Sequence, residues 1–146
     1  MPKLYVMCGI SGSGKTYWTE HNFNVAADRT VSTDCIRGEL WGDENDQQQP
    51  EKVFETAFNR ITYYLKAEYN VFFDATNLSA RDRKKIIKRY CNLADELICV
   101  DFGNDVSRAL KNQASRARKV PTEVIERQAK KYKKPSYGEG WDVIMF

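Results

Sequence analysis

The sequence predicts an α/β fold, in which a central, mostly parallel β-sheet is flanked by helices. Short apolar runs alternate along the chain with stretches of helical periodicity, which is the pattern of successive β-α-β units. A glycine-rich segment between the first apolar run and the first helical stretch is typical of the same fold class. The runs expected to form strands are residues 3–8, 29–33, 70–74, 95–101 and 141–145.

Helical periodicity and capping residues define the elements between these strands. Ser79 followed by Asp82 is a capping-box pattern, and Pro50 suits the first turn of a helix. After Pro50, four apolar residues recur at helical spacing and are expected to pack on the sheet: Phe54, Phe58, Ile61 and Leu65. Helices are expected over residues 15–21, 51–68, 80–91, 104–115 and 121–132.

The size and charge of the chain set broad limits. Its 146 residues can bury a sizeable core, and we expect residues 1–146 to form a single domain. The net charge of +3 permits a nucleic-acid or phosphorylated substrate without requiring one. No apolar run approaches the roughly 18 residues of a membrane span, and no signal peptide is visible, so no membrane partner is expected. The sequence leaves the oligomeric state open.

The cysteines indicate a reducing compartment rather than a metal site. None of the four is paired as C-x-x-C, and His21 is the one histidine, which argues against zinc. Cys8 and Cys99 lie inside apolar runs and are expected in the core. We therefore expect a cytoplasmic protein.

The segment from Gly9 to Thr16 matches G-x-x-x-x-G-K-[ST] at every fixed position. Glycines allow a close approach to a phosphate chain, and the backbone amides and the following helix favour an anion. Lys15 would contact the β- and γ-phosphates, and the Thr16 hydroxyl would bind Mg²⁺. An ordinary glycine-rich turn is the alternative, which the strand before and the helix after disfavour. The residues expected to bind the nucleotide are Gly12, Ser13, Gly14, Lys15 and Thr16.

A second candidate segment, Ser32 to Arg37, follows the second expected strand. Ligands of open α/β sheets bind at the carboxyl ends of strands. Asp34 would accept the proton of an attacking hydroxyl. Arg37, one helical turn later, would hold a phosphate or the transition state. The alternative is a helix cap with a solvated arginine.

The third expected strand ends in polar residues. Asp74 ends this apolar strand, and a carboxylate at such a position commonly holds Mg²⁺ or its water shell in phosphate-loop proteins. Thr76 and Asn77 would then face the cleft and bind substrate. Ordinary turn chemistry is the alternative, since Asp, Thr and Asn all favour turns.

A basic segment, residues 112–121, lies between the last two expected helices. It suits a small basic lid that closes over a transferring phosphoryl group. Arg116 or Arg118 would reach the γ-phosphate, and a solvated basic turn is the alternative. Two further groups of cations could bind a nucleic-acid backbone, but a solvated helix face is the favoured interpretation of both. The first group is Arg81, Arg83, Lys84, Lys85, Lys88 and Arg89, and the second is Lys130, Lys131, Lys133 and Lys134.

Together these motifs, in this order, resemble the 5′-hydroxyl polynucleotide kinases of bacteriophages and the wider P-loop kinase family. The segments that carry the likeness are 9–16, 32–37, 74–78 and 116–125. The resemblance implies a P-loop kinase fold that uses ATP and Mg²⁺, with Asp34 as general base. It implies that Arg37 contacts the acceptor or the transferring phosphate. Arg116 is the better match to the lid arginine, and Arg118 stays open.

The resemblance further implies transfer of phosphate to the 5′-hydroxyl of single-stranded or end-exposed nucleic acid, in the host cytoplasm if the chain is phage-encoded. A D-x-D-x-T phosphatase signature is absent. Two alternatives remain. A small-molecule or nucleoside-monophosphate kinase would share the phosphate-handling residues. A non-catalytic nucleotide-binding module would bind ATP without transfer, although the absence of N-K-x-D disfavours a GTPase.

Overall fold

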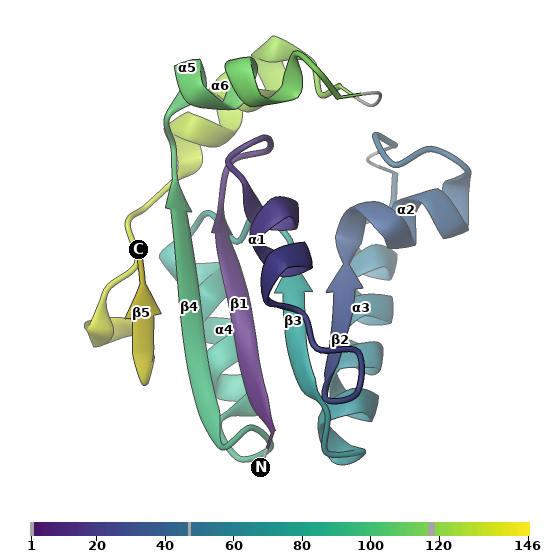
Figure 1. The fold of residues 1–146 in the computed structure, drawn as a ribbon, viewed down its shortest axis with the longest axis vertical. Helices are drawn as coiled ribbons and strands as arrows, with labels where there is room; N and C mark the ends of the chain where they lie inside the picture. Colours follow the sequence, from purple (N-terminus) through teal and green to yellow (C-terminus); the bar gives the residue numbers. More distant parts are fainter. Residues whose placement is uncertain (1, 47, 117–118) are drawn as a thin grey trace.

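The computed structural model describes residues 2–46, 48–116 and 119–146. Five strands form one sheet in the order β2-β3-β1-β4-β5, and every neighbouring pair is parallel (Figure 1). The expected α/β class is therefore confirmed. The strands are β1 (Lys3–Gly9), β2 (Asp28–Ser32), β3 (Asn70–Asp74), β4 (Glu96–Gly103) and β5 (Val143–Met145).

Helices cover both faces of the sheet and the end at which its strands terminate. In Figure 1, α1 lies in front of the sheet, α3 and α4 lie behind it, and α5 and α6 lie beyond the carboxyl ends of the strands. The sequence motifs that directly follow strands therefore lie together at the carboxyl end of the sheet, next to α5 and α6. The helices are α1 (Lys15–Asn22), α2 (Thr33–Trp41), α3 (Pro50–Lys66), α4 (Ala80–Tyr90), α5 (Val106–Gln113) and α6 (Thr122–Lys131), with a short 3₁₀ helix, η1 (Tyr137–Glu139).

The element that the sequence analysis did not delimit is α2. Its beginning is fixed by Ser32, whose Oγ accepts a hydrogen bond from the Cys35 amide (3.2 Å). Its end is fixed by Gly42, which adopts a left-handed conformation (φ 77°) and donates its amide to Gly38 O (2.9 Å). These are ordinary capping interactions. The helix is short and carries little apolar periodicity, so its pattern was weak.

Alternation along β1 divides the core between the two faces of the sheet. Leu4, Val6 and Cys8 are fully buried beneath α3 and α4, whereas Met7 packs on the other face with Trp18 of α1. Successive strand residues point to opposite faces, and both faces of this sheet are covered. Cys8 and Cys99 are fully buried, as expected.

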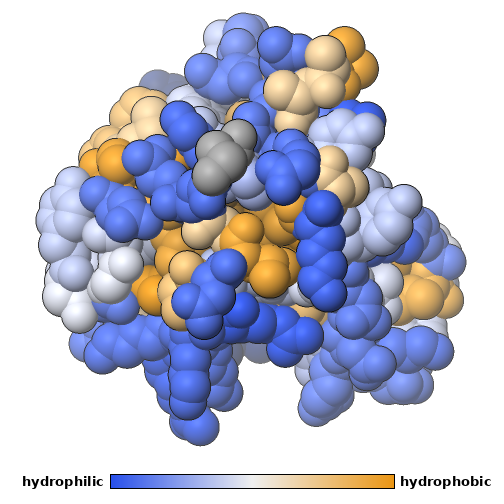
Figure 2. Space-filling view, turned by 90° about the horizontal axis from the view of Figure 1, so that it is seen from below, coloured by the Kyte–Doolittle hydropathy of each residue, from blue (hydrophilic) through white to orange (hydrophobic). Residues whose placement is uncertain are grey.

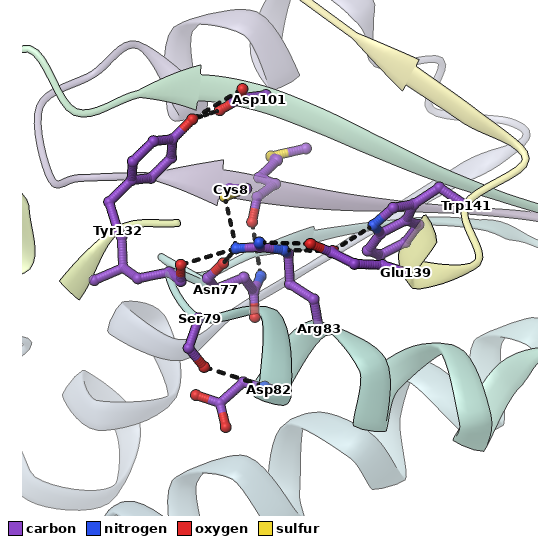
Figure 3. Close-up of polar contacts among 11 residues, drawn as sticks. Cys8, Asn77, Ser79, Asp82, Arg83, Asp101, Tyr132, Glu139 and Trp141 are labelled. Carbon is purple, nitrogen blue, oxygen red and sulfur yellow. Dashed lines mark hydrogen bonds and ion pairs between the residues drawn. The ribbon is translucent and has the colours of Figure 1, made fainter. Parts of the chain in front are cut away.

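One cation of α4 is in the core rather than in solvent. Arg83 is fully buried and forms two bonds to Glu139, from Nε to Oε1 (2.8 Å) and from Nη2 to Oε2 (2.9 Å). Trp141 Nε1 also donates to Glu139 Oε1 (3.0 Å), so η1 is tied to α4 (Figure 3). Arg83 therefore does not belong to the exposed basic face expected on this helix. The other cations of α4 are exposed.

The opposite end of the molecule, at the amino ends of the strands, has a different surface. Figure 2 shows hydrophobic side chains at the centre of that view, with hydrophilic side chains around them. Within the part of the chain that the structure describes, no helix is long and apolar enough to cross a bilayer.

We predict that Glu139→Ala lowers the free energy of unfolding by about 3–5 kcal/mol, because it leaves the buried Arg83 charge without its partner. Urea denaturation followed by tryptophan fluorescence measures the change. Glu55→Ala on the exposed side of α3 is the matched control and should shift stability by less than about 0.5 kcal/mol.

The ion pair between Arg83 and Glu139 also makes the stability of the fold depend on pH. Burial alone raises the pKa of Glu139, but hydrogen bonds from Arg83 and Trp141 outweigh burial and hold this pKa below its usual range. The stabilisation is therefore complete above the ordinary glutamate pKa of about 4.3 and is lost as the pH falls through the lower folded value. The stability gap between wild type and Glu139→Ala should shrink in acid. A gap that stays constant down to about pH 2 would contradict this account.

Candidate functional site

The glycine-rich segment forms a tight loop between β1 and α1, here called the P-loop (residues 9–16). Gly12 (φ 82°) and Gly14 (φ 106°) adopt left-handed conformations, and Gly14 is the N-cap of α1. No side chain caps this helix end, so its first amides remain available to an anion. The Ser13 amide, expected among the phosphate donors, instead donates to Ile10 O within the loop (3.2 Å).

Lys15 is the cation of this loop. It is 8% exposed, and its Nζ donates to Gly9 O (2.9 Å) and Ile10 O (2.8 Å). Burial lowers the pKa of Lys15, while the negative charges of Asp74 and Asp34 oppose that change. The ammonium is therefore held over the loop by these two carbonyl groups.

Thr16 and Asp74 meet across the cleft. The Thr16 hydroxyl donates to Asp74 Oδ2 (3.2 Å). Burial raises the pKa of Asp74, and the positive charge of Lys15 opposes the rise. Among the described residues, no three His, Cys, Asp or Glu side chains gather to hold a metal by themselves. These two oxygen donors fit Mg²⁺, which usually takes one or two protein ligands together with phosphates and water.

Asp34 and Arg37 lie one turn apart on α2. Arg37 Nη1 and Asp34 Oδ1 form an ion pair at 2.9 Å. The arginine side chain is 11% exposed and the carboxylate 42% exposed, so the acid is the more accessible partner. Both side chains face the same cleft as Lys15 and Asp74.

A cleft of about 830 Å³ unites most of the expected site. Its walls are the P-loop, the beginning of α2, the end of β3, and the α5–α6 pair. Arg116 also lines it and lies close enough to affect the pKa values of both Lys15 and Asp74. Arg118, the other candidate lid arginine, lies outside the described residues. Expected site residues on the walls are Gly12, Gly14, Lys15, Thr16, Asp34, Arg37, Asp74, Thr76 and Arg116.

Asn77 does not line this cleft, although Thr76 does. Asn77 is 7% exposed, has a left-handed φ of 46°, and donates its amide Nδ2 to Met7 O (2.7 Å). Arg83 Nη1 donates to Asn77 O (2.9 Å) and to Leu78 O (2.8 Å) (Figure 3). The structure therefore places Asn77 as a support of the turn after β3, where sequence reasoning expected a substrate contact.

Two carboxamides that contact the P-loop were not expected as site residues. Asn112 Nδ2 of α5 donates to Gly12 O (3.0 Å), and the Ser11 amide donates to Gln128 Oε1 of α6 (2.8 Å). Asn112 lies in the basic segment 112–121, in which the sequence analysis singled out only the arginines as site residues. Nothing in the local sequence marks Gln128, since its partner is 117 residues away.

A second cavity, of about 560 Å³, lies on the other side of the P-loop. Ser13 faces this cavity rather than the main cleft, and Tyr17 lines both. The remaining walls combine aromatic rings with cations, notably Trp18, Phe102, Phe146, Arg108 and Lys134.

The model of the AAA domain family matches residues 4–135. No curated protein matches the sequence. Solved structures share the fold at low identity. A chain of the Pnkp1/Rnl/Hen1 RNA repair complex has a TM-score of 0.76 and 22% identity, over 89% of this chain and 43% of that chain.

Two other solved structures show how widely this fold is used. A fungal RNA kinase has a TM-score of 0.68 and 13% identity, over 98% of this chain and 37% of that chain. A gluconokinase from Sinorhizobium meliloti 1021 has a TM-score of 0.67 and 15% identity, over 99% of this chain and 81% of that chain. The chain thus spans less than half the length of the RNA repair and RNA kinase chains. At these identities the likeness establishes the P-loop kinase fold.

We predict that Gly12→Ala abolishes nucleotide binding. A Cβ at Gly12 would lie 2.8 Å from the Ala109 carbonyl oxygen, and the φ of 82° is itself unfavourable for alanine. The loop must therefore shift away from α5. Calorimetric titration with ATP and Mg²⁺ measures the loss.

Gly138→Ala is the matched control, because its added Cβ meets nothing nearer than the Ser136 hydroxyl at 3.7 Å. Gly138→Ala should bind ATP like the wild type. Wild-type affinity in Gly12→Ala would show that the loop geometry is not needed for binding.

Proposed function

This chain belongs to the AAA domain family, and we propose that it transfers the γ-phosphate of ATP to the 5′-hydroxyl of a polynucleotide. Its fold is that of a P-loop kinase-type nucleotide-binding domain. The observation that carries the proposal is one cleft with two chemically different ends. The P-loop with Lys15 and Thr16 follows β1 and forms one end. The accessible carboxylate of Asp34, beside Arg37, follows β2, on the far side of β3, and forms the other.

The donor nucleotide takes the P-loop end. Phosphate oxygens replace the Gly9 and Ile10 carbonyls on Lys15 and accept from the amides at the beginning of α1. The second cavity adjoins this loop through Tyr17, and its aromatic and cationic walls suit a nucleobase and its ribose. Triphosphate and base thus lie on the two sides of one loop.

Thr16 and Asp74 are the residues that would hold Mg²⁺ at this end, directly or through water. When bound, the ion neutralises charge on the β- and γ-phosphate oxygens. Burial raises the pKa of Asp74 because it disfavours the ionised carboxylate, and a cation beside the carboxylate would offset that cost.

Asp34 is the general base of the proposal. Its carboxylate accepts the proton of the 5′-hydroxyl as that oxygen forms a bond to the γ-phosphorus and the bond to the β,γ-bridging oxygen breaks, which releases ADP. Arg37, bonded to Asp34 at 2.9 Å, stands beside the acceptor and contributes a positive charge for its phosphate. Thr76 lines the wall between Asp34 and the P-loop and would contact the acceptor.

Arg116 supplies a further positive charge from the segment between α5 and α6. An arginine that stabilises a transferring phosphoryl group is worth about 10³–10⁵ in rate. The position of Arg116 on the cleft wall supports this role. Arg118 remains the other candidate.

The similar structures and the charge of the chain support a polynucleotide acceptor. Two of the similar structures are named for RNA, one as an RNA repair complex and one as an RNA kinase. The net charge of +3 is compatible with a polyanion. The likeness to a gluconokinase over 99% of this chain favours a small polyol acceptor as the second candidate.

Transfer of labelled γ-phosphate separates these candidates. The acceptors are a 5′-hydroxyl DNA oligonucleotide, the same sequence in RNA, each in 5′-phosphorylated form, and gluconate. The proposal predicts label on 5′-hydroxyl oligonucleotides alone. Label on gluconate alone would contradict the proposal and identify a small-molecule kinase. ATP binding without label on any acceptor would favour a non-catalytic nucleotide-binding module.

We further predict that Asp34→Ala lowers the turnover number by about 10²–10⁴, as loss of a general base does. ATP affinity should stay within a few-fold, because Asp34 is not on the P-loop. Glu39→Ala, which removes another acid of α2 that pairs with Arg60 on the surface, is the control and should keep wild-type turnover. Equal rates in Asp34→Ala and wild type would remove Asp34 from the mechanism.

A further inference from the structure

The α5–α6 pair is docked on the P-loop through a small core of its own. Ile10 of the P-loop is fully buried in a cluster with Ala109 of α5, Ile125 of α6 and Val120 between them. Gly12 packs so closely on Ala109 that no Cβ would fit between them. Apolar contact therefore joins the two helices to the loop.

Polar side chains fix this arrangement at defined points. Asn112 bonds Gly12 O from α5, and Gln128 bonds the Ser11 amide from α6. Each helix thus contributes one carboxamide to a different peptide of the loop. These contacts tie α5 and α6 to the loop on both sides of the basic segment 112–121, which the sequence analysis expected to act as a lid.

Gln113, the last residue of α5, connects this helix to Arg116. Its side chain is 7% exposed and bridges the backbone of Val120 in both directions, with Nε2 donating to Val120 O (2.9 Å) and Oε1 accepting from Val120 N (3.1 Å). The backbone carbonyl of Gln113 also accepts from the Arg116 amide (3.0 Å). Gln113 thus bonds the backbone of Val120 through its side chain and the backbone of Arg116 through its own carbonyl.

We propose that Gln113 is a positioning residue: its side chain, bonded to Val120, anchors the end of α5, and its backbone carbonyl, bonded to the Arg116 amide, sets Arg116 relative to the P-loop. Its role rests on the proposed function, because Arg116 must act on the transferring phosphate for its position to matter. Gln113 itself is turned into the protein and does not line the cleft. Its influence on the reaction therefore runs through the backbone that it holds.

The variant that tests this proposal is Gln113→Met, which keeps the length and bulk of the side chain but removes both bonds to Val120. Displacing a catalytic group by about 1 Å costs about 10²-fold in rate. We expect kcat to fall about 10- to 100-fold, while KM for ATP changes less than about threefold, since the contacts of Asn112 and Gln128 remain. Lys111→Met, the same substitution at an exposed position of α5, is the control and should leave both constants unchanged.

Two readouts separate positioning from general damage. Hydrogen exchange of the Val120 amide should accelerate in Gln113→Met, while exchange of the Ser11 amide, which Gln128 holds, should not change. In an Arg116→Ala background the same substitution should lower kcat by less than about twofold, because two changes that act through one group are not additive. An equal loss of kcat in both backgrounds would overturn the proposal, as would unchanged kcat despite faster exchange at Val120.

The failure of the proposed function gives a different result. If Arg116→Ala retains wild-type turnover, the arginine has no role in transfer, and the proposal for Gln113 falls with it. If the wild type transfers phosphate to no acceptor, the exchange of Val120 still decides whether Gln113 holds this segment, and unchanged exchange overturns it. Should Gln113→Met not fold, Gln113→Glu keeps the bond from the Val120 amide and loses the one to its carbonyl, and the same comparisons apply.

Discussion

The left-handed backbone of the P-loop at Gly12 and Gly14 is the constraint on which the rest of the site depends. This backbone begins α1 without a side-chain cap, and it turns Lys15 back over Gly9 and Ile10. A loop of this shape has few contacts of its own, so neighbouring elements must hold it. Ile10 enters the core of the α5–α6 pair, and the Gly9 amide donates to Thr76 O (2.9 Å). The α5–α6 pair and the turn after β3 are thereby held to the same loop.

Charge is arranged around the cleft in compensating pairs. The buried Lys15 lies within electrostatic range of Asp74 and Asp34, and Arg37 is paired with Asp34. Burial of a lone ammonium or carboxylate is costly, and opposite charges nearby reduce that cost. A phosphate chain with its metal ion brings both signs at once, so it can enter without leaving any of these groups uncompensated. This is a physical reason why one cleft suits both a polyanionic donor and a proton-accepting carboxylate.

Sequence reasoning succeeded where a feature depends on neighbours in the chain. The strands, most helices and the P-loop follow from periodicity and spacing, and the cap of α4 forms as expected, with the Asp82 amide donating to Ser79 Oγ (3.1 Å). It failed where the partner is distant. Arg83 looks like one of several solvated cations until Glu139, 56 residues later, is placed against it. Asn77 looked like a substrate ligand for the same reason, because its bond to Met7 exists only once β1 and β3 are neighbours.

The central claim is that donor and acceptor occupy two ends of one cleft, and hydrogen exchange tests it most directly. ATP with Mg²⁺ should protect amides of residues 9–16. A 5′-hydroxyl oligonucleotide added to that complex should then protect residues 33–37 and 74–78 as well, whereas its 5′-phosphorylated form should protect them less. Protection by the oligonucleotide at another surface, with residues 33–37 unchanged, would contradict the account and move the acceptor away from Asp34.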